Sequence, residues 1–321
     1  MPTPLVSPMR ASRKMLRCAR SGLLVLCAVA TATAVSSASA QTTPASSASQ
    51  AVDVDVPFIV SPPAVTQAML DIARVNARDY LIDLGAGDGR VVILAATRYG
   101  ARGLGVEIDP QLVKRAQANA KAAKVEARAE FREEDLFKTD LSPASVVTMY
   151  LLPAVNLQLR ERLLALKPGT RLVSHDWDMG DWQPDEERSV AAPDKPIGKD
   201  KTSRVMLWVV PAQMAGKWCG TDDAEATLTV SQRYQKAEGK LVVGSGKQRS
   251  EIRFRVTLSG NAFVLPLPDG DIPARINGDE LEFLSTRVHA GFKLRRAAEA
   301  DSCALPQRLV MHSTLEGTNS Q

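Results

Sequence analysis

Hydrophobic and polar positions change their spacing along the chain. From Pro63 onward the apolar residues recur every three or four positions, which is the period of a helix with one buried face. Tyr80–Leu84 is a short apolar run that enters a glycine-rich turn, a pattern that predicts a buried strand. After Pro211 the period falls to two, because apolar and polar residues alternate over 252–258. The spacing therefore predicts a part with helices and strands, followed by a part built from strands alone.

Strand and helix patterns alternate throughout the first part. After the helix that begins at Pro63, strands are predicted at 80–84, 103–108, 127–131, 145–151 and 171–174, and helices at 91–99, 110–124 and 154–166. Alternation at this spacing is typical of a Rossmann-like α/β fold with a doubly wound, mostly parallel sheet. A late strand at 204–210 is expected on the edge of that sheet.

The second part is predicted to be a small all-β domain. Its strand patterns run from about residue 216 to 296, and Asn277 followed by Gly278 is a two-residue hairpin signal between extended runs. A small sandwich or barrel would satisfy this pattern. The expected domains are therefore 57–212 for the α/β part and 213–300 for the all-β part, with a C-terminal tail at 301–321.

The N-terminus has the three parts of a secretory signal peptide. Five basic residues precede a short apolar run at 22–35, and Ala38-Ser39-Ala40 forms an A-x-A cleavage site. We expect a signal peptide at 1–40, a flexible linker at 41–56 and an exported, periplasmic protein. The alternative is an uncleaved inner-membrane anchor, with membrane association through this segment.

The charge of the chain argues against nucleic acid as a binding partner. The chain has 40 Lys+Arg and 36 Asp+Glu residues, but five of the basic residues lie in the expected signal peptide. Without that segment the chain is close to neutral, so it lacks the basic surface typical of a nucleic-acid-binding protein.

The cysteines outside the expected signal peptide are Cys219 and Cys303. In an exported chain these two could form one disulfide, and two unpaired thiols are the alternative.

Chemistry-bearing residues concentrate at the end of the first predicted strand. Residues 83–89 read Asp-Leu-Gly-Ala-Gly-Asp-Gly and precede a predicted helix. Glycines at a strand-to-helix turn let the backbone approach a ligand closely. Glu107 follows about 20 residues later at the end of the next strand, where a carboxylate can bind both hydroxyls of a ribose.

The spacing of the glycines distinguishes between cofactors. The dinucleotide fingerprint is G-x-G-x-x-G, whereas this turn is G-x-G-x-G and contains Asp83 and Asp88, which would repel a pyrophosphate. Carboxylates suit S-adenosylmethionine, which carries an ammonium and a sulfonium. Asp135 can accept a hydrogen bond from an adenine amino group, and Leu136 can pack against the ring. A helix-capping role for Asp135 is the alternative.

A family resemblance rests on five segments. They are 58–62 (Phe-Ile-Val-Ser-Pro), 83–92 (Asp-Leu-Gly-Ala-Gly-Asp-Gly-Arg-Val-Val), 105–109 (Gly-Val-Glu-Ile-Asp), 135–138 (Asp-Leu-Phe-Lys) and 146–153 (Val-Val-Thr-Met-Tyr-Leu-Leu-Pro). Residues 57–185 resemble the small class I, seven-strand S-adenosylmethionine-dependent protein-lysine methyltransferases. That family includes enzymes acting on the c-subunit of ATP synthase and on the adenine nucleotide translocase. The resemblance does not extend to the all-β domain.

The resemblance implies a seven-strand sheet, S-adenosylmethionine as cofactor and a methyl-acceptor substrate, a protein lysine or another amine. It places Tyr150 near the transferred methyl group, where we expect it to line the acceptor channel; a core aromatic residue is the alternative. The predicted cofactor-binding residues are Asp83, Gly85, Ala86, Gly87, Asp88, Gly89, Glu107, Ile108, Asp135 and Leu136.

Other functions have less support in the residues. The run 175–178 (His-Asp-Trp-Asp) follows a strand and is read as a turn at the rim of the site, and no metal site is predicted. A noncatalytic envelope protein with a nucleoside-binding Rossmann-like domain is the alternative from a different class. A nicotinamide-dependent oxidoreductase is disfavoured by the missing third glycine of its fingerprint.

Overall fold

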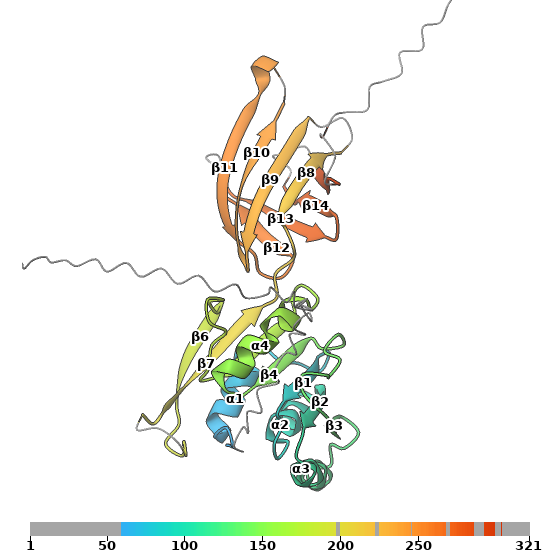
Figure 1. Ribbon diagram of the computed structural model, residues 1–321, viewed down its shortest axis with the longest axis vertical. Helices are drawn as coiled ribbons and strands as arrows, with labels where there is room; N and C mark the ends of the chain where they lie inside the picture. The colour runs from blue at the N-terminus through green and yellow to red at the C-terminus, as the bar shows by residue number, and fades with distance from the viewer. Residues whose placement is uncertain are drawn as a thin grey trace, which may run out of the picture. The chain divides into compact units, whose positions relative to one another are not determined.

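A computed structural model describes residues 59–196, 200–221, 225–244, 246–267, 270–285, 292–298 and Cys303 (Figure 1). The expected signal peptide, the linker at 41–56 and the tail apart from Cys303 lie outside the described residues. His289 and His312 lie outside them as well. Among the residues that are described, no helix is long and apolar enough to cross a membrane.

The first part of the chain forms a seven-strand sheet flanked by helices. Its elements follow one another as α1 (Pro63–Ile72), β1 (Tyr80–Leu84), α2 (Arg90–Tyr99), β2 (Arg102–Glu107), α3 (Pro110–Ala122), β3 (Ala129–Glu133), β4 (Val146–Met149), α4 (Pro153–Leu164), β5 (Arg171–His175), β6 (Glu186–Ala191) and β7 (Thr202–Val209). The strand order is β3-β2-β1-β4-β5-β7-β6. All neighbours pair in parallel except β5 with β7 and β6 with β7. The expected mostly parallel sheet is confirmed.

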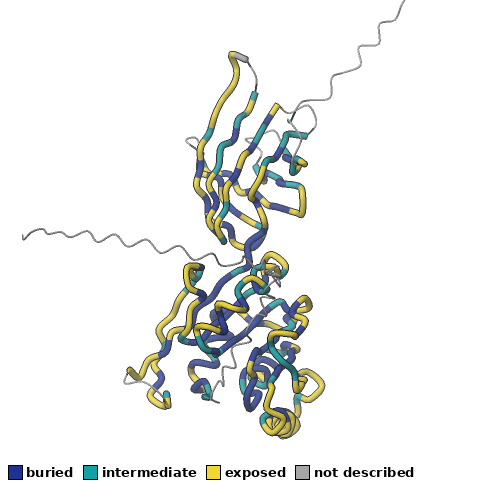
Figure 2. Tube along the Cα trace, viewed as in Figure 1, coloured by how far each residue is buried: buried dark blue, intermediate teal, exposed yellow. Residues whose placement is uncertain are grey.

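Both faces of this sheet are buried, as the apolar runs predicted. Leu81 and Val146 point to the face covered by α1, α2 and α3, whereas Ile82 and Val147 point to the face covered by α4. Figure 2 shows the resulting buried centre around β1 and β4. Because the helices lie on both faces, the carboxyl ends of the central strands remain the place where a ligand can enter.

The outer strands differ from the prediction. The strand expected at 204–210 is β7, but it lies between β5 and β6 and is not at the edge. The edge strand is β6, which the sequence pattern did not reveal because most of its residues are exposed or half-buried. The fourth strand ends at Met149, earlier than the predicted 151, so Tyr150 lies just beyond it.

The second part is one antiparallel sheet of eight strands: β8 (Gly216–Gly220), β9 (Ala226–Arg233), β10 (Lys236–Val243), β11 (Ser250–Thr257), β12 (Ala262–Leu265), β13 (Ile272–Asn277), β14 (Glu280–Phe283) and β15 (Lys293–Arg296). A short 3-10 helix, η1 (Gly246–Gln248), precedes β11. The alternate apolar residues form one core, including Trp218, Leu228, Phe254 and Leu281. The all-β prediction is confirmed, and β15 pairs with β8, so the first and last strands are neighbours. The β13–β14 hairpin turns at Gly278 and Asp279, one residue later than the signal suggested.

A disulfide joins Cys219 to Cys303, with Cα atoms 5.2 Å apart and a sequence separation of 84. The predicted bridge is therefore confirmed. It ties β8 to the C-terminal segment that follows β15. Closing a loop of this length restricts the unfolded chain, which stabilises the fold by up to about 4 kcal/mol.

The β9–β10 turn contacts the segment that follows β5. Tyr234 stacks on the fully buried Trp182, with ring centroids 5.7 Å apart, and its hydroxyl donates to Asp181 at 2.8 Å. The amide of Gln235 donates to the carbonyl of Gln183 at 2.8 Å. Tyr234 of the all-β sheet thus packs against the core between α4 and the seven-strand sheet.

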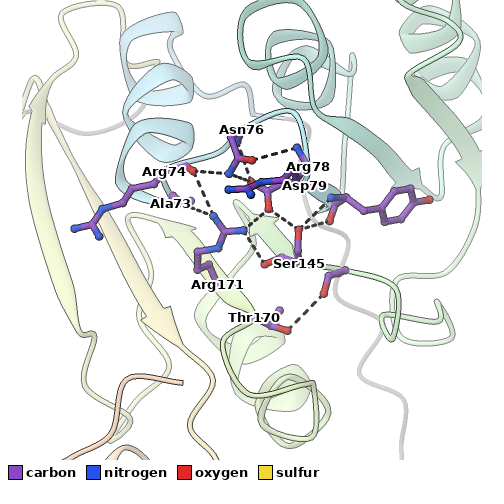
Figure 3. A network of polar contacts seen from close by, with 10 residues as sticks. Ala73, Arg74, Asn76, Arg78, Asp79, Ser145, Thr170 and Arg171 are labelled. Carbon is purple, nitrogen blue, oxygen red and sulfur yellow. Dashed lines mark hydrogen bonds and ion pairs between the residues drawn. The ribbon is translucent and has the colours of Figure 1, made fainter. Parts of the chain in front are cut away.

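A buried ion pair fixes the amino ends of three strands (Figure 3). Asp79 is 6% exposed and pairs with Arg171 at the start of β5. The same carboxylate accepts hydrogen bonds from the Ser145 hydroxyl at 2.8 Å and from Asn76 at 2.9 Å. Arg171 also donates to the carbonyl of Ala73 at 2.6 Å. These contacts hold β1, β4 and β5 in register at their amino ends, opposite the carboxyl ends where a ligand can enter.

We predict that Arg171→Ala lowers the free energy of unfolding by about 3 kcal/mol, because it leaves a buried carboxylate without its charge partner. Arg132→Ala is the matched control. Its ion pair with Glu130 is about half exposed, with side chains 51% and 54% accessible, so the loss should stay below about 1 kcal/mol. Urea unfolding of both variants measures the difference. Equal losses would show that the buried pair does not stabilise the sheet.

Candidate cofactor and acceptor site

Three glycines shape the turn between β1 and α2. Gly85, Gly87 and Gly89 have φ values of 73°, 55° and 82°, a region that other residues rarely adopt. The N–H groups of Gly85 and Ala86 donate to the carbonyl of Val106 at 3.0 and 2.9 Å, which ties the turn to β2. A Cβ at Gly89 would lie 2.6 Å from the Phe131 ring, so packing against β3 also requires glycine there.

Glu107 is fixed at the end of β2, beside this turn. One carboxylate oxygen accepts from the N–H of Gly87 at 2.9 Å, and the other accepts from the N–H groups of Ile108 and Asp109 at 2.9 and 3.2 Å. The carboxylate is only half-buried, so it can still accept from a ligand. A carboxylate held in this position can bind the hydroxyls of a ribose, as the sequence predicted.

Asp83 lies at the bottom of the site and is 4% exposed. Its carboxyl oxygen lies 2.6 Å from the hydroxyl of Thr148 on β4. Burial raises the pKa of Asp83 to about 7, with smaller contributions in the same direction from Glu107 and Asp88, while the Thr148 hydrogen bond opposes the shift. A buried carboxyl group of this kind gains from the arrival of a cationic ligand group.

Asp88 is paired within the turn. Its two oxygens accept from Arg90 at 2.9 and 2.7 Å, and this hydrogen bonding lowers the pKa of Asp88. Arg90 thus neutralises the charge of Asp88 and gives it a structural role in the turn, and the predicted contact of Asp88 with the cofactor stays a prediction.

Asp135 caps a turn, not the helix that was the alternative for it, because residues 136–138 form a turn after β3. Its oxygen accepts from the N–H of Phe137 at 2.9 Å, and its second oxygen lies 3.4 Å from the ammonium of Lys138. The adjacent Leu136 packs partly against the core of the sheet. Both residues follow β3, near the exposed Ile108 that follows β2, so their predicted contact with an adenine ring stays a prediction.

These residues fit S-adenosylmethionine. β1 lies between β2 and β4, where the sheet order reverses, and ligands of such sheets bind at the carboxyl ends of the strands. There Asp83 would face the ammonium of the cofactor, the glycine turn would allow close backbone approach, and Glu107 would suit a ribose. An ionised Asp83 would repel a pyrophosphate, which argues against a dinucleotide, whereas Asp88 adds little to this repulsion because it is paired with Arg90.

Tyr150 lies at the same edge, directly after β4. Its ring is half-buried and stacks on His175 with centroids 3.8 Å apart. Within the described residues its hydroxyl makes no hydrogen bond, which fits an acceptor-channel residue better than a core aromatic with a satisfied hydroxyl. Burial raises the pKa of Tyr150, with a smaller contribution from Asp176.

His175 is a site residue that the sequence interpretation missed. The 175–178 run was expected at the rim, but the His175 side chain is fully buried beneath Tyr150. Trp177 is 42% exposed and remains at the rim. Among the described residues, no group of three or more His, Cys, Asp and Glu side chains is placed to hold a metal ion.

Comparison with known proteins places the site in a family. A family model described as the ANTKMT methyltransferase domain matches residues 83–186. A protein-lysine N-methyltransferase of Saccharolobus islandicus (strain REY15A) is 42% identical over 133 residues, covering 41% of this chain and 83% of that protein. The adenine nucleotide translocase lysine N-methyltransferase of Mus musculus is 34% identical over 133 residues, covering 41% of this chain and 57% of that protein.

A second mouse relative, the lysine N-methyltransferase of the ATP synthase c-subunit, is 33% identical over 135 residues, covering 41% of this chain and 53% of that protein. The chain thus spans little more than half the length of the two mouse relatives. Among solved structures, an RNA methyltransferase from Salinibacter ruber in complex with S-adenosyl-L-homocysteine is 49% identical, with a TM-score of 0.44, over 49% of this chain and 96% of that one.

We predict that Glu107→Ala weakens S-adenosylmethionine binding by about 1 to 3 kcal/mol, the cost typical of losing a charged hydrogen-bond acceptor. Glu133→Ala, at the end of β3 and exposed, is the control and should bind as the parent does. Isothermal calorimetry measures both. Parent-like affinity in the Glu107 variant would exclude the ribose assignment.

We predict that the affinity for S-adenosylmethionine rises with pH and levels off above the Asp83 pKa of about 7. The ligand's ammonium favours the carboxylate, so below that pKa binding must first remove a proton, at up to about 1.4 kcal/mol per pH unit. Asp83→Asn should bind more weakly and without this slope. Calorimetry between about pH 5.5 and about pH 8 gives both profiles, and a flat profile for the parent would contradict the assignment.

Proposed function

We propose that this chain, which belongs to the family of S-adenosylmethionine-dependent protein-lysine N-methyltransferases, methylates the side-chain amine of a lysine in a protein. The observation that carries the proposal is the placement of Tyr150 at the same strand edge as the glycine turn and Glu107. The lysine acceptor is supported by the names of the relatives, which include protein-lysine N-methyltransferases. Another amine is the alternative acceptor.

S-adenosylmethionine supplies an electrophilic methyl group on a positively charged sulfur. The chain's own residues would position the reactants: Asp83 would bind the ammonium of the cofactor, Glu107 would bind its ribose hydroxyls, and Tyr150 would form a wall of the acceptor channel. Placing an amine in line with a methyl group can lower the barrier by several kcal/mol without a dedicated base.

The acceptor amine must lose a proton before it attacks. A lysine has a pKa of about 10.4 in water, and burial beside a positive charge lowers it. Two large apolar side chains are exposed, Leu157 on α4 at 45% and Trp177 after β5 at 42%. We propose that these side chains exclude water around the entering amine.

The central test is methyl transfer to protein. We expect the purified chain to move the isotopically labelled methyl of S-adenosylmethionine into an envelope-protein extract, with the label recovered as methyllysine after acid hydrolysis. Tyr150→Phe should slow transfer by about tenfold or more if its hydroxyl orients the amine. Label recovered in other amino acids would replace lysine as the acceptor.

Tyr99→Phe is the matched control for the loss of a tyrosine hydroxyl. Tyr99 ends α2, and its hydroxyl donates to Asp71 at 2.5 Å, away from the strand edge that carries the site. Its rate should equal that of the parent. Equal rates in all three proteins would remove Tyr150 from the acceptor channel.

We propose that the protein is exported to the periplasm. The basic start, apolar run and A-x-A site support export, and so does the disulfide, which forms in oxidising compartments. Without the signal peptide, the chain has only Cys219 and Cys303. We expect neither to be alkylated in denatured, unreduced protein from the native host, and both after reduction. Two free thiols without reductant would favour a domain that faces the cytosol.

A further inference from the structure

A fully buried histidine underlies the acceptor tyrosine. His175 is the last residue of β5, with 0% of its surface exposed. Its ring stacks on that of Tyr150, with centroids 3.8 Å apart and planes 27° from parallel. At this separation the imidazole limits how far the phenol ring can tilt into the sheet.

Two serine hydroxyls hold the imidazole. The hydroxyl of Ser61, which precedes α1, lies 2.8 Å from Nδ1, and that of Ser203 on β7 lies 2.9 Å from Nε2. Both serines are buried, 6% and 1% exposed. A neutral imidazole has one donor and one acceptor nitrogen, and each nitrogen here has its partner. The ring therefore cannot rotate without breaking both hydrogen bonds.

The surroundings keep this ring uncharged. Burial lowers the pKa of His175 to about 4; the negative charge of Asp176 opposes the shift and the positive charge of Lys195 adds to it. The Asp176 carboxylate lies 3.4 Å from Nε2, but it also pairs with Lys195 at 2.8 Å. A neutral ring adds no cation beside the place where a sulfonium must bind.

The same hydrogen-bond chain reaches the cofactor turn. The carbonyl of Ser61 accepts from Arg90 at 2.7 Å, and Arg90 in turn holds the Asp88 carboxylate of the glycine turn. The contacts thus run without a gap from the turn that shapes the cofactor site to the ring behind Tyr150.

We infer that His175 is a positioning residue that holds the ring of Tyr150 at the acceptor side of the crevice, in an orientation fixed by Ser61 and Ser203. The inference rests on the proposed function, since the position of Tyr150 matters only if this residue lines the acceptor channel. A displacement of about 1 Å at such a site can slow a reaction by about a hundredfold.

Nuclear magnetic resonance of the full chain with ring-labelled tyrosine tests the positioning directly. The chain has four tyrosines, and Tyr150→Phe identifies the Tyr150 signal. Ser203→Ala should shift that signal, because Ser203 holds the imidazole, with no stacking of its own on Tyr150. Ser231→Ala, which removes an exposed serine hydroxyl on β9 of the all-β sheet, should leave it in place. An unmoved Tyr150 signal in Ser203→Ala would overturn the inference.

Methyl transfer at saturating cofactor supplies a second, kinetic test. His175→Phe should slow transfer by about 10- to 100-fold while its affinity for S-adenosylmethionine stays within about twofold of the parent. If His175 acts through Tyr150, the double variant with Tyr150→Phe is no slower than Tyr150→Phe alone. Losses that multiply would mean a general structural role and would overturn the inference. A parent chain that transfers no methyl would instead refute the proposed function, and the resonance experiment would still decide the positioning.

Discussion

The hydrogen bond from the Gly87 N–H to the Glu107 carboxylate joins the two elements on which the site depends. It closes the turn after β1 against the end of β2, while the N–H groups of Gly85 and Ala86 bind the carbonyl of Val106. This arrangement requires glycines with positive φ, since the backbone must reverse within a few residues and approach a carboxylate. The cofactor site is therefore a consequence of how one strand ends and the next helix begins.

Contacts at the amino ends of the strands fix the position of this site. The Asp79 and Arg171 pair holds β1, β4 and β5 at their amino ends, so their carboxyl ends emerge at fixed positions. Asp83 on β1 is then the partner of Thr148 on β4, two residues before Tyr150. The amino ends of these strands thus carry a structural ion pair, whereas their carboxyl ends carry the carboxyl groups of the candidate site.

Local patterns predicted the parts of the fold and site that depend on neighbours in sequence. The glycine turn, Glu107, the helices and the alternation of the all-β sheet all have signals within a few residues of themselves. β6 lacked such a signal, because a mostly exposed edge strand has no apolar period, and the place of β7 beside β5 depends on pairing between distant segments. His175 was missed for the same reason, since its partners Ser61 and Ser203 are 114 and 28 residues away. Only the folded sheet brings them together.

The most direct test of this account is a calorimetric titration of the purified chain with S-adenosylmethionine and, separately, with NAD. The account predicts a heat of binding with S-adenosylmethionine and none with NAD, because the acidic glycine turn suits a cationic ligand and repels a pyrophosphate. Binding of NAD, with no heat from S-adenosylmethionine, would contradict it.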